Sequence, residues 1–118
     1  MPEKINLIEK VNSVSGLFEY LEIGCFNGNS LNVLQAESRT LDFHIHENSD
    51  ELFYVIEGTF DIELDTGIIS LSQNDLIIIP KGMRHRPIVT SLVKCLLIEL
   101  DGTLNPGNTG GAYNNSEK

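Results

Sequence analysis

Short apolar segments, broken at regular intervals by turn-forming residues, constrain the fold of this chain more than any other feature. About nine such segments occur, each of roughly four to nine residues. They lie at residues 20–26, 29–35, 41–46, 52–56, 60–64, 68–71, 76–79, 86–89 and 92–100. The breaks are rich in Gly, Asn, Asp and Ser, and Asn27–Gly28 is the strongest short signal for a β-hairpin. Strands this short and this evenly spaced predict an all-β sandwich or barrel.

The length of 118 residues leaves room for a single domain. We expect its core at about residues 20–101, after a lead-in at 1–19 and before a tail at 102–118. In the lead-in, Ile5, Ile8, Val11 and Val14 have a spacing that suits one helical turn. The tail is rich in Gly and Asn, so it does not belong to the core.

Acidic residues dominate the charge, because 17 Asp and Glu against 8 Lys and Arg give a net charge of −9. Such a surface repels nucleic acids and anionic membranes, so we expect neither as a partner. The longest apolar run, residues 76–79, is far shorter than a membrane span, and no continuous apolar stretch follows the first residues, so we expect no signal peptide. Cys25 and Cys95 form no C-x-x-C pair, and we expect them to be reduced core thiols of a cytoplasmic protein.

The chain has 3 histidines, and all of them fall into one pattern with a glutamate. His44 and His46 are two residues apart in an expected strand, so their side chains project from the same face. Glu51 begins the next strand, where an antiparallel return brings it beside that pair. His85 follows a turn that contains Pro and Gly. Three imidazoles and one carboxylate suit a divalent first-row metal ion.

The spacing of these residues resembles the two motifs of the cupin superfamily. The first motif reads His44-x-His46, four residues, Glu51, six residues, Gly58, and the second reads Pro80-x-Gly82-x-x-His85. The chain also looks like the small single-domain cupins in which a Gly-Thr-Leu-Asn segment, here residues 102–105, follows the last strand. The resemblance implies a jelly-roll barrel, or double-stranded β-helix, and an ion of Mn, Fe, Ni or Zn held by His44, His46, Glu51 and His85.

Among the positions that depart from the cupin pattern are Ser38 and Asn74, which stand where the motifs usually begin with glycine. Asn tolerates a positive φ better than most residues, so we still expect a tight turn at Asn74. Ser38 indicates an altered approach to the first metal strand. Neither change removes a predicted ligand.

Strand alternation extends the predicted site beyond the four ligands. It places five further side chains on the faces of the ligands: Thr40, Asp42, Phe53, Val55 and Met83. Asp42 is then a candidate for proton transfer, for orienting a ligand histidine or for binding a substrate hydroxyl. The alternative is an acid at the solvated mouth of the barrel.

Basic residues crowd the turn at His85, where Lys81, Arg84 and Arg86 lie close together in the sequence. They form either a positive rim that attracts an anionic substrate or partners for surface acids. Because Arg84 and Arg86 flank His85, alternation favours the second interpretation.

Three functional hypotheses follow from this pattern. The first is a metal-dependent enzyme acting on an oxygen-rich small molecule by isomerase, lyase or dioxygenase chemistry. The second is a binding module, a sensor or carrier that holds metal and ligand without turnover. The third is a metal-free structural barrel. Ligand residues alone do not separate turnover from binding, because a fold does not fix a function.

The faces turned away from the predicted metal are also apolar, which predicts a homodimer. They carry six large side chains: Leu41, Phe43, Ile45, Leu52, Tyr54 and Ile56. A sheet face in contact with water is normally polar, so something must cover this patch. We expect a second subunit on a two-fold axis to do so, and the alternative is the lead-in around Ile5 of the same chain.

Overall fold

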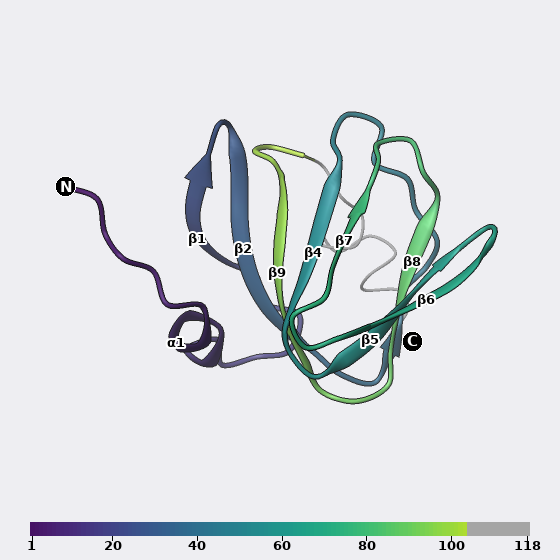
Figure 1. The fold of residues 1–118 in the computed structure, drawn as a ribbon, viewed down its shortest axis with the longest axis horizontal. Coiled ribbons are helices and arrows are strands. Elements are labelled where there is room, and N and C mark those ends of the chain that lie inside the picture. Colours follow the sequence, from purple (N-terminus) through teal and green to yellow (C-terminus); the bar gives the residue numbers. More distant parts are fainter. Residues whose placement is uncertain (104–118) are drawn as a thin grey trace.

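The computed structural model of the protein describes residues 1–103, in which one short helix precedes nine strands (Figure 1). The elements are α1 (Leu7–Asn12), β1 (Leu21–Phe26), β2 (Asn29–Ala36), β3 (Arg39–Thr40), β4 (Glu51–Glu57), β5 (Thr59–Leu64), β6 (Gly67–Ser72), β7 (Leu76–Ile79), β8 (His85–Val89) and β9 (Val93–Leu100). A five-stranded sheet has the order β1-β2-β9-β4-β7, and a four-stranded sheet has the order β3-β8-β5-β6. The two sheets enclose the core, so the predicted jelly-roll architecture is confirmed.

Turn residues have the backbone conformations that their sequence predicts. Asn27 and Gly28, which join β1 to β2, have φ angles of 51° and 80°. Asn74 has a φ of 73°, as expected for its tight turn, and Ser38 has a φ of 55°. Ser38 therefore adopts the left-handed conformation that glycine favours.

The core between the sheets consists of side chains that alternate along the strands. In β4 the inward side chains of Phe53 and Val55 are buried, and they pack with Phe60 and Ile62 of the opposite sheet. Cys95 of β9 is also buried. Cys25, in contrast, is exposed at the end of β1, so the expectation that both cysteines are core thiols is wrong for Cys25.

The lead-in forms the predicted helical turn and lies on the outside of the five-stranded sheet (Figure 1). The Asn6 side chain caps α1 by accepting a hydrogen bond of 2.9 Å from the Glu9 amide. Val11 of α1 is fully buried against Ile56 and Leu96 on the outer face of the sheet. The same chain thus covers part of the patch for which we expected a second subunit.

Residues 41–46 do not form the continuous strand that the sequence predicts. The chain pairs with β8 at Arg39–Thr40 and again through an isolated bridge at His44. Between these points the alternation slips by one residue, so Leu41 is buried while Thr40 and Asp42 are exposed. The prediction that Thr40 and Asp42 face the barrel interior is therefore wrong, as is the placement of Leu41 on the outer face.

The tail predicted for residues 102–118 lies outside the described residues from position 104 onward. The described residues contain no helix whose length and hydropathy would carry it across a membrane.

Candidate metal centre

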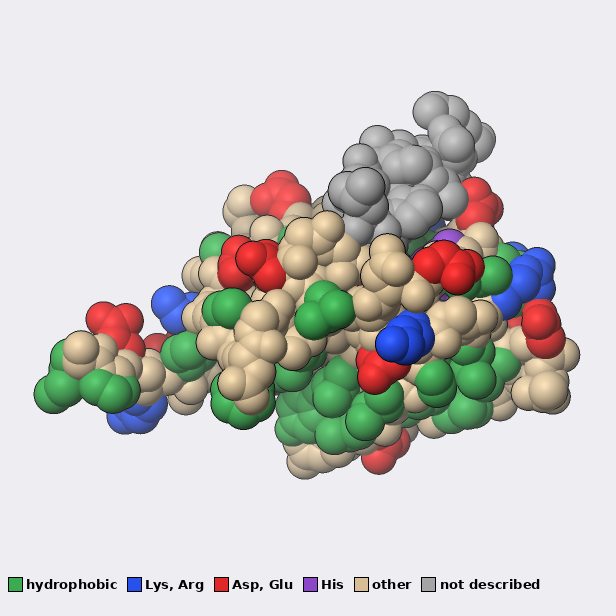
Figure 2. All heavy atoms as spheres, turned by 90° about the horizontal axis from the view of Figure 1, so that it is seen from above, with side chains coloured by type: hydrophobic (Ala, Val, Ile, Leu, Met, Phe, Trp, Pro, Cys, Tyr) green, Lys and Arg blue, Asp and Glu red, His purple; other side chains and the backbone are tan. Residues whose placement is uncertain are grey.

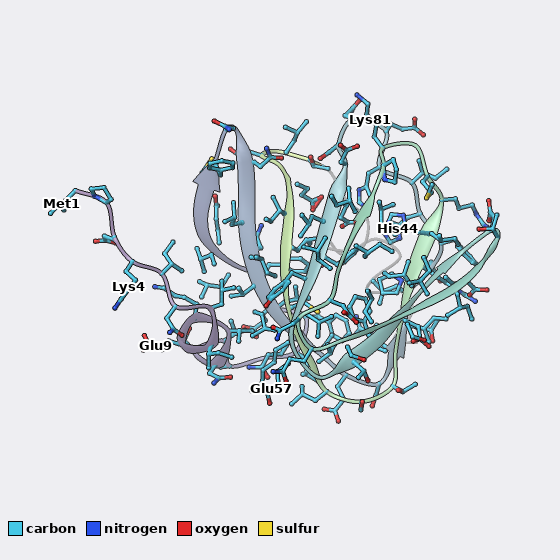
Figure 3. The ribbon with its side chains drawn as sticks, viewed as in Figure 1. Met1, Lys4, Glu9, His44, Glu57 and Lys81 are labelled. Atoms are coloured by element: carbon cyan, nitrogen blue, oxygen red, sulfur yellow. The ribbon has the colours of Figure 1, made fainter. Side chains whose placement is uncertain are left out.

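Four side chains predicted to bind a metal meet at one end of the barrel. His44 and His46 come from the segment after β3, Glu51 begins β4 and His85 begins β8. Their potential ligand atoms all lie within 4.8 Å of one another. His46, Glu51 and His85 are buried, and His44 is half-buried. Figure 3 shows the labelled His44 between the sheets, at the end of the barrel where Lys81 lies and far from Glu57.

Backbone hydrogen bonds hold the histidine segments together. His44 and His85 form an antiparallel bridge with reciprocal N–H to C=O hydrogen bonds of 3.0 Å each. The Gly82 amide donates to the His46 carbonyl at 2.8 Å. The turn that precedes His85 is thereby tied to the segment that carries the other two histidines.

The loop before Glu51 is fixed from two sides. The buried Ser49 hydroxyl accepts a hydrogen bond of 2.9 Å from the Leu100 amide. The Asp50 carboxylate accepts one of 2.9 Å from the Lys81 amide. These contacts place Glu51 at the start of β4 with its side chain turned into the barrel.

Hydrogen bonds to the main chain set the tautomers of two histidines. Nδ1 of His44 donates to the Asp42 carbonyl and Nδ1 of His85 donates to the Met83 carbonyl, both at 2.9 Å. A carbonyl oxygen only accepts, so each Nδ1 carries a proton. In a neutral ring, Nε2 then has a free lone pair available to a metal ion.

Two of the Nε2 atoms, those of His46 and His85, lie close to one carboxylate oxygen. Nε2 of His85 lies 2.8 Å from Oε1 of Glu51, and Nε2 of His46 lies 3.2 Å from the same oxygen. Neither ring nitrogen of His46 has a hydrogen-bond partner among the described residues, although the ring is buried. Acceptor atoms this close repel each other unless a proton or a cation lies between them. The three nitrogens and the carboxylate oxygen therefore fit a divalent first-row metal ion.

The pKa values of the site reflect the same proximity. Burial by itself opposes ionisation of Glu51, but the contacts with His46 and His85 outweigh it and lower its pKa to about 2. Burial also opposes a charge on His46, yet the Glu51 carboxylate and, at longer range, Glu99 raise its pKa. For His44, burial dominates and lowers the pKa.

Glu99 is a second buried carboxylate at this end of the barrel, and we did not single it out from the sequence. It is only 4% exposed and lies on β9, with Leu97 as its inward neighbour in the alternation. Leu52 of β4 pairs with Ile98 of β9 in an antiparallel register. Extending this register by one residue places Glu51 opposite Glu99. The strand alternation of β9 could have identified this residue from the sequence, because every second side chain points inward: Val93, Cys95, Leu97 and Glu99.

The other predicted site residues are placed as follows. Phe53 forms a wall, with its ring centroid 6.4 Å from that of His85, and Val55 lies deeper in the core. Met83 is 40% exposed and lines a surface groove instead of the barrel interior, although its carbonyl holds His85. Thr40 and Asp42 are exposed, and Asp42 contacts the ligand His44 through its main-chain carbonyl.

Beyond Phe53 the barrel interior is apolar. A cavity of about 40 Å³ lies there, with Leu41, Phe53 and Pro87 among its lining residues. Any group that enters the barrel past the ligands meets hydrocarbon, so polar recognition is confined to the histidine end.

The arginines near His85 are paired with surface acids, as strand alternation favoured. Arg84 contacts Asp65 at 2.6 Å and Arg86 contacts Glu63 at 2.8 Å. Both guanidinium groups also stack on the Phe43 ring, at 3.8 and 4.3 Å from its centroid. Phe43 is thereby covered within the chain, which removes another residue from the predicted dimer patch.

Most of the barrel matches a family of known sequences. The family model Cupin_2, described as a cupin domain, matches residues 32–100. The fold is similar to that of a cupin-2 domain-containing protein from Shewanella frigidimarina, with a TM-score of 0.77 and 28% sequence identity. That similarity covers 81% of this chain and 93% of the other.

Curated relatives share shorter segments. The uncharacterized protein YdbB of Bacillus subtilis is 48% identical over 46 residues, which are 38% of this chain and 41% of that protein. Acetate kinase EutQ of Clostridioides difficile is 40% identical over 52 residues, which are 44% of this chain and 32% of that protein. The chain thus matches less than half the length of each of these relatives.

Proposed function

Because the chain belongs to the Cupin_2 family of cupin domains, we propose that it binds one divalent metal ion and acts there on a small, oxygen-rich molecule. The observation that carries the proposal is the convergence of the His46 and His85 Nε2 atoms on one oxygen of Glu51. His44, His46, Glu51 and His85 would hold the ion, and Mn, Fe, Ni and Zn all suit this ligand set. When bound, the ion would polarise a carbonyl or enolate oxygen as a Lewis acid.

The chain's own side chains would divide the remaining tasks. Phe53 closes the barrel behind His85 and limits the access of water from that side. Glu99 is buried next to the ligand set and is the acid best placed to take or return a proton. A substrate that chelates the ion would be converted here by isomerase, lyase or dioxygenase chemistry. The match to EutQ spans 32% of that protein, too little to support an acetate kinase activity here.

A binding module without turnover is the second candidate. The observation that favours it is the exposure of Asp42, because the acid first considered for proton transfer lies outside the barrel. A sensor or carrier needs the metal ligands but not a proton-transfer group.

Metal analysis tests the proposal first. Protein purified under reducing conditions should contain about one divalent ion per chain, and Glu51→Gln should lose it while Glu63→Gln keeps it. Glu63 is a matched control because it pairs with Arg86 on the surface. Failure of the wild-type protein to take up Mn, Fe, Co, Ni or Zn would reject the metal site. A screen of loaded protein against sugars, keto acids and diols then separates an enzyme, which converts one, from a module that only binds.

A further inference from the structure

The inner face of the five-stranded sheet carries polar side chains at the histidine end. Ser30 of β2 pairs with Glu99 of β9, and the register of β9 with β4 places Glu51 opposite Glu99. The side chains of Ser30, Glu51 and Glu99 are all buried. Polar groups therefore continue from one candidate metal ligand across two strand spacings, about 10 Å, to β2.

Asn32 of β2 adds an amide group beside these residues. In the same strand Leu34 belongs to the inner core, whereas Val33 packs with α1 on the outer face. By alternation, Asn32 faces inward together with Ser30. Its side chain is half-buried, and within residues 1–103 the structure shows no hydrogen bond for it. We call Ser30, Asn32 and Glu99 the polar wall of the site.

The basic side chains near the site lie outside it. Arg84 and Arg86 are paired with surface acids. Lys81 is exposed, and Figure 3 shows it at the tip of the loop between β7 and β8, away from His44. No lysine or arginine of residues 1–103 is buried. Within this part of the chain, no buried cation is therefore available to hold an anionic group of a ligand.

Acidic groups also line the approach to the site beside β9. A groove of about 410 Å³ lies there, with Glu47, Asn48 and Asp101 among its lining residues. The Asp101 carboxylate accepts a hydrogen bond of 2.8 Å from the Ser30 hydroxyl, so the groove adjoins the polar wall. Figure 2 views the molecule from the histidine end and shows histidine atoms at the surface beside acidic side chains. A carboxylate or phosphate ligand would be repelled along this approach.

The charges at the site favour a neutral ligand. Glu51 balances one of the two positive charges of a divalent ion held by neutral histidines, and Glu99 balances the other. An anionic ligand would then leave a net negative charge in a buried site, where an uncompensated charge is costly. Carboxylate and amide oxygens accept hydrogen bonds from hydroxyl groups, so the polar wall suits a ligand rich in hydroxyls.

We propose that the ligand of this site is a neutral polyhydroxy compound, a sugar or sugar alcohol with a chain of about six carbon atoms. One end chelates the ion, and hydroxyl groups further along the chain bond to Ser30, Asn32 and Glu99. The length follows from the distance between β4 and β2. This inference rests on the metal-dependent function proposed above, and it excludes keto acids from the compounds on which that function acts.

Equilibrium dialysis with two matched probes tests the charge preference. Radiolabelled sorbitol and gluconate are acyclic compounds of equal chain length, and they differ by a hydroxymethyl group against a carboxylate. Metal-loaded wild-type protein should bind sorbitol at least about tenfold more tightly than gluconate. This order is opposite to that expected from the ion alone, because a carboxylate attracts a divalent ion more strongly than a hydroxyl group does.

Two variants separate the role of the amide from that of the charge. Asn32→Ala removes the amide without adding bulk, so the affinity for sorbitol should fall at least about tenfold at unchanged metal content. Asn12→Ala is its control, because that amide contacts Lys94 on the outer side of the sheet. Glu99→Gln removes the buried charge and should raise the affinity for gluconate relative to sorbitol by about tenfold. Glu63→Gln, at the surface, should leave this ratio unchanged.

The outcomes distinguish this inference from the proposed function. A wild type that takes up no divalent ion refutes the proposed function itself. A loaded wild type that binds gluconate as tightly as sorbitol, or binds neither probe, refutes the ligand class alone. Full sorbitol affinity in Asn32→Ala, or an unchanged ratio in Glu99→Gln, refutes recognition by the polar wall. The comparison of the two probes on wild-type protein needs no variant, so misfolding of a variant does not affect it.

Discussion

Nε2 of His85 lies 2.8 Å from Oε1 of Glu51, while Nδ1 of the same ring donates to the Met83 carbonyl. The ring is therefore fixed in orientation, and its free lone pair faces a buried carboxylate. Such a contact is stable only with a cation or a proton between the two atoms. Glu51 is thus the residue on which metal affinity and the protonation of the site both depend.

Replacing Glu51 by Gln should separate metal binding from folding. The amide group can donate to His85 Nε2 and so relieves the contact without a metal, which should leave the metal-free fold intact. Loss of the anionic ligand should weaken metal binding by at least roughly 100-fold. Metal titration of Glu51→Gln against Glu63→Gln measures the difference, and equal affinities would show that the carboxylate is not a ligand.

Metal binding should become weaker as the pH falls. The raised pKa of His46 means that this ring holds a proton below and somewhat above pH 6.5, and a metal ion must displace it. Below this range the apparent affinity should fall by about tenfold per pH unit for each proton displaced. The stabilisation of the melting temperature by added metal, measured at several pH values, checks the trend. Stabilisation that is independent of pH would contradict it.

In the metal-free protein, the His46–Glu51 contact should stabilise the fold over a defined pH range. Its contribution through His46 is full below pH 6.5 and is lost as the pH rises through the raised pKa. The contribution through Glu51 is present above pH 4.5 and is lost as the pH falls through about 2. Urea unfolding of wild type and His46→Gln should therefore differ most between pH 4.5 and 6.5. A larger difference at alkaline pH would be inconsistent with this contact.

Gly58 should tolerate substitution much less than Gly28. Both glycines have positive φ angles, of 95° and 80°, so alanine strains the backbone at either site by about 1–2 kcal/mol. At Gly58, however, a Cβ atom would lie 2.5 Å from the Leu92 carbonyl oxygen, whereas the space around Gly28 is open. The free energy of unfolding should therefore fall at least about twice as much in Gly58→Ala. Chemical denaturation of both variants decides this, and equal losses would refute the steric argument.

If a turnover is found, Glu99 should matter more for it than Asp42. Glu99→Gln should lower kcat by about 100-fold or more while metal content is retained, because a buried proton acceptor is lost. Asp42→Asn should leave kcat nearly unchanged, since that carboxylate is exposed. The pH profile of kcat distinguishes proton transfer from a structural effect. A reversed order of the two variants would restore Asp42 as the proton-transfer residue.

The strands and the ligand set were predictable because they follow local rules. Turn residues mark the breaks, and strand alternation places His44 beside His46 and Phe53 beside Glu51. Alternation failed between Leu41 and His44, where the chain lacks continuous pairing and its side chains lose their fixed period. No local pattern in the sequence marks such a slip.

The segments that cover the outward-facing apolar side chains were less predictable, because they are brought there by tertiary packing. Phe43 is shielded by Arg84 and Arg86, which join it from a segment about forty residues away in sequence. Ile56 is buried by α1, whose weak periodicity indicated a helical turn but not the surface on which it lies. Sequence patterns show which side chains need cover, while the three-dimensional path of the chain decides what supplies it.

The origin of the ligands in different sheets has a mechanical consequence. Glu51 belongs to the five-stranded sheet and His85 to the four-stranded sheet, so their contact clamps the layers at one end of the sandwich. Toward the other end, the layers are held together by packing among side chains such as Val93 of the five-stranded sheet and Val89 of the four-stranded sheet. Slow motions that separate the two sheets should therefore be smallest at the histidine end and largest at the opposite end.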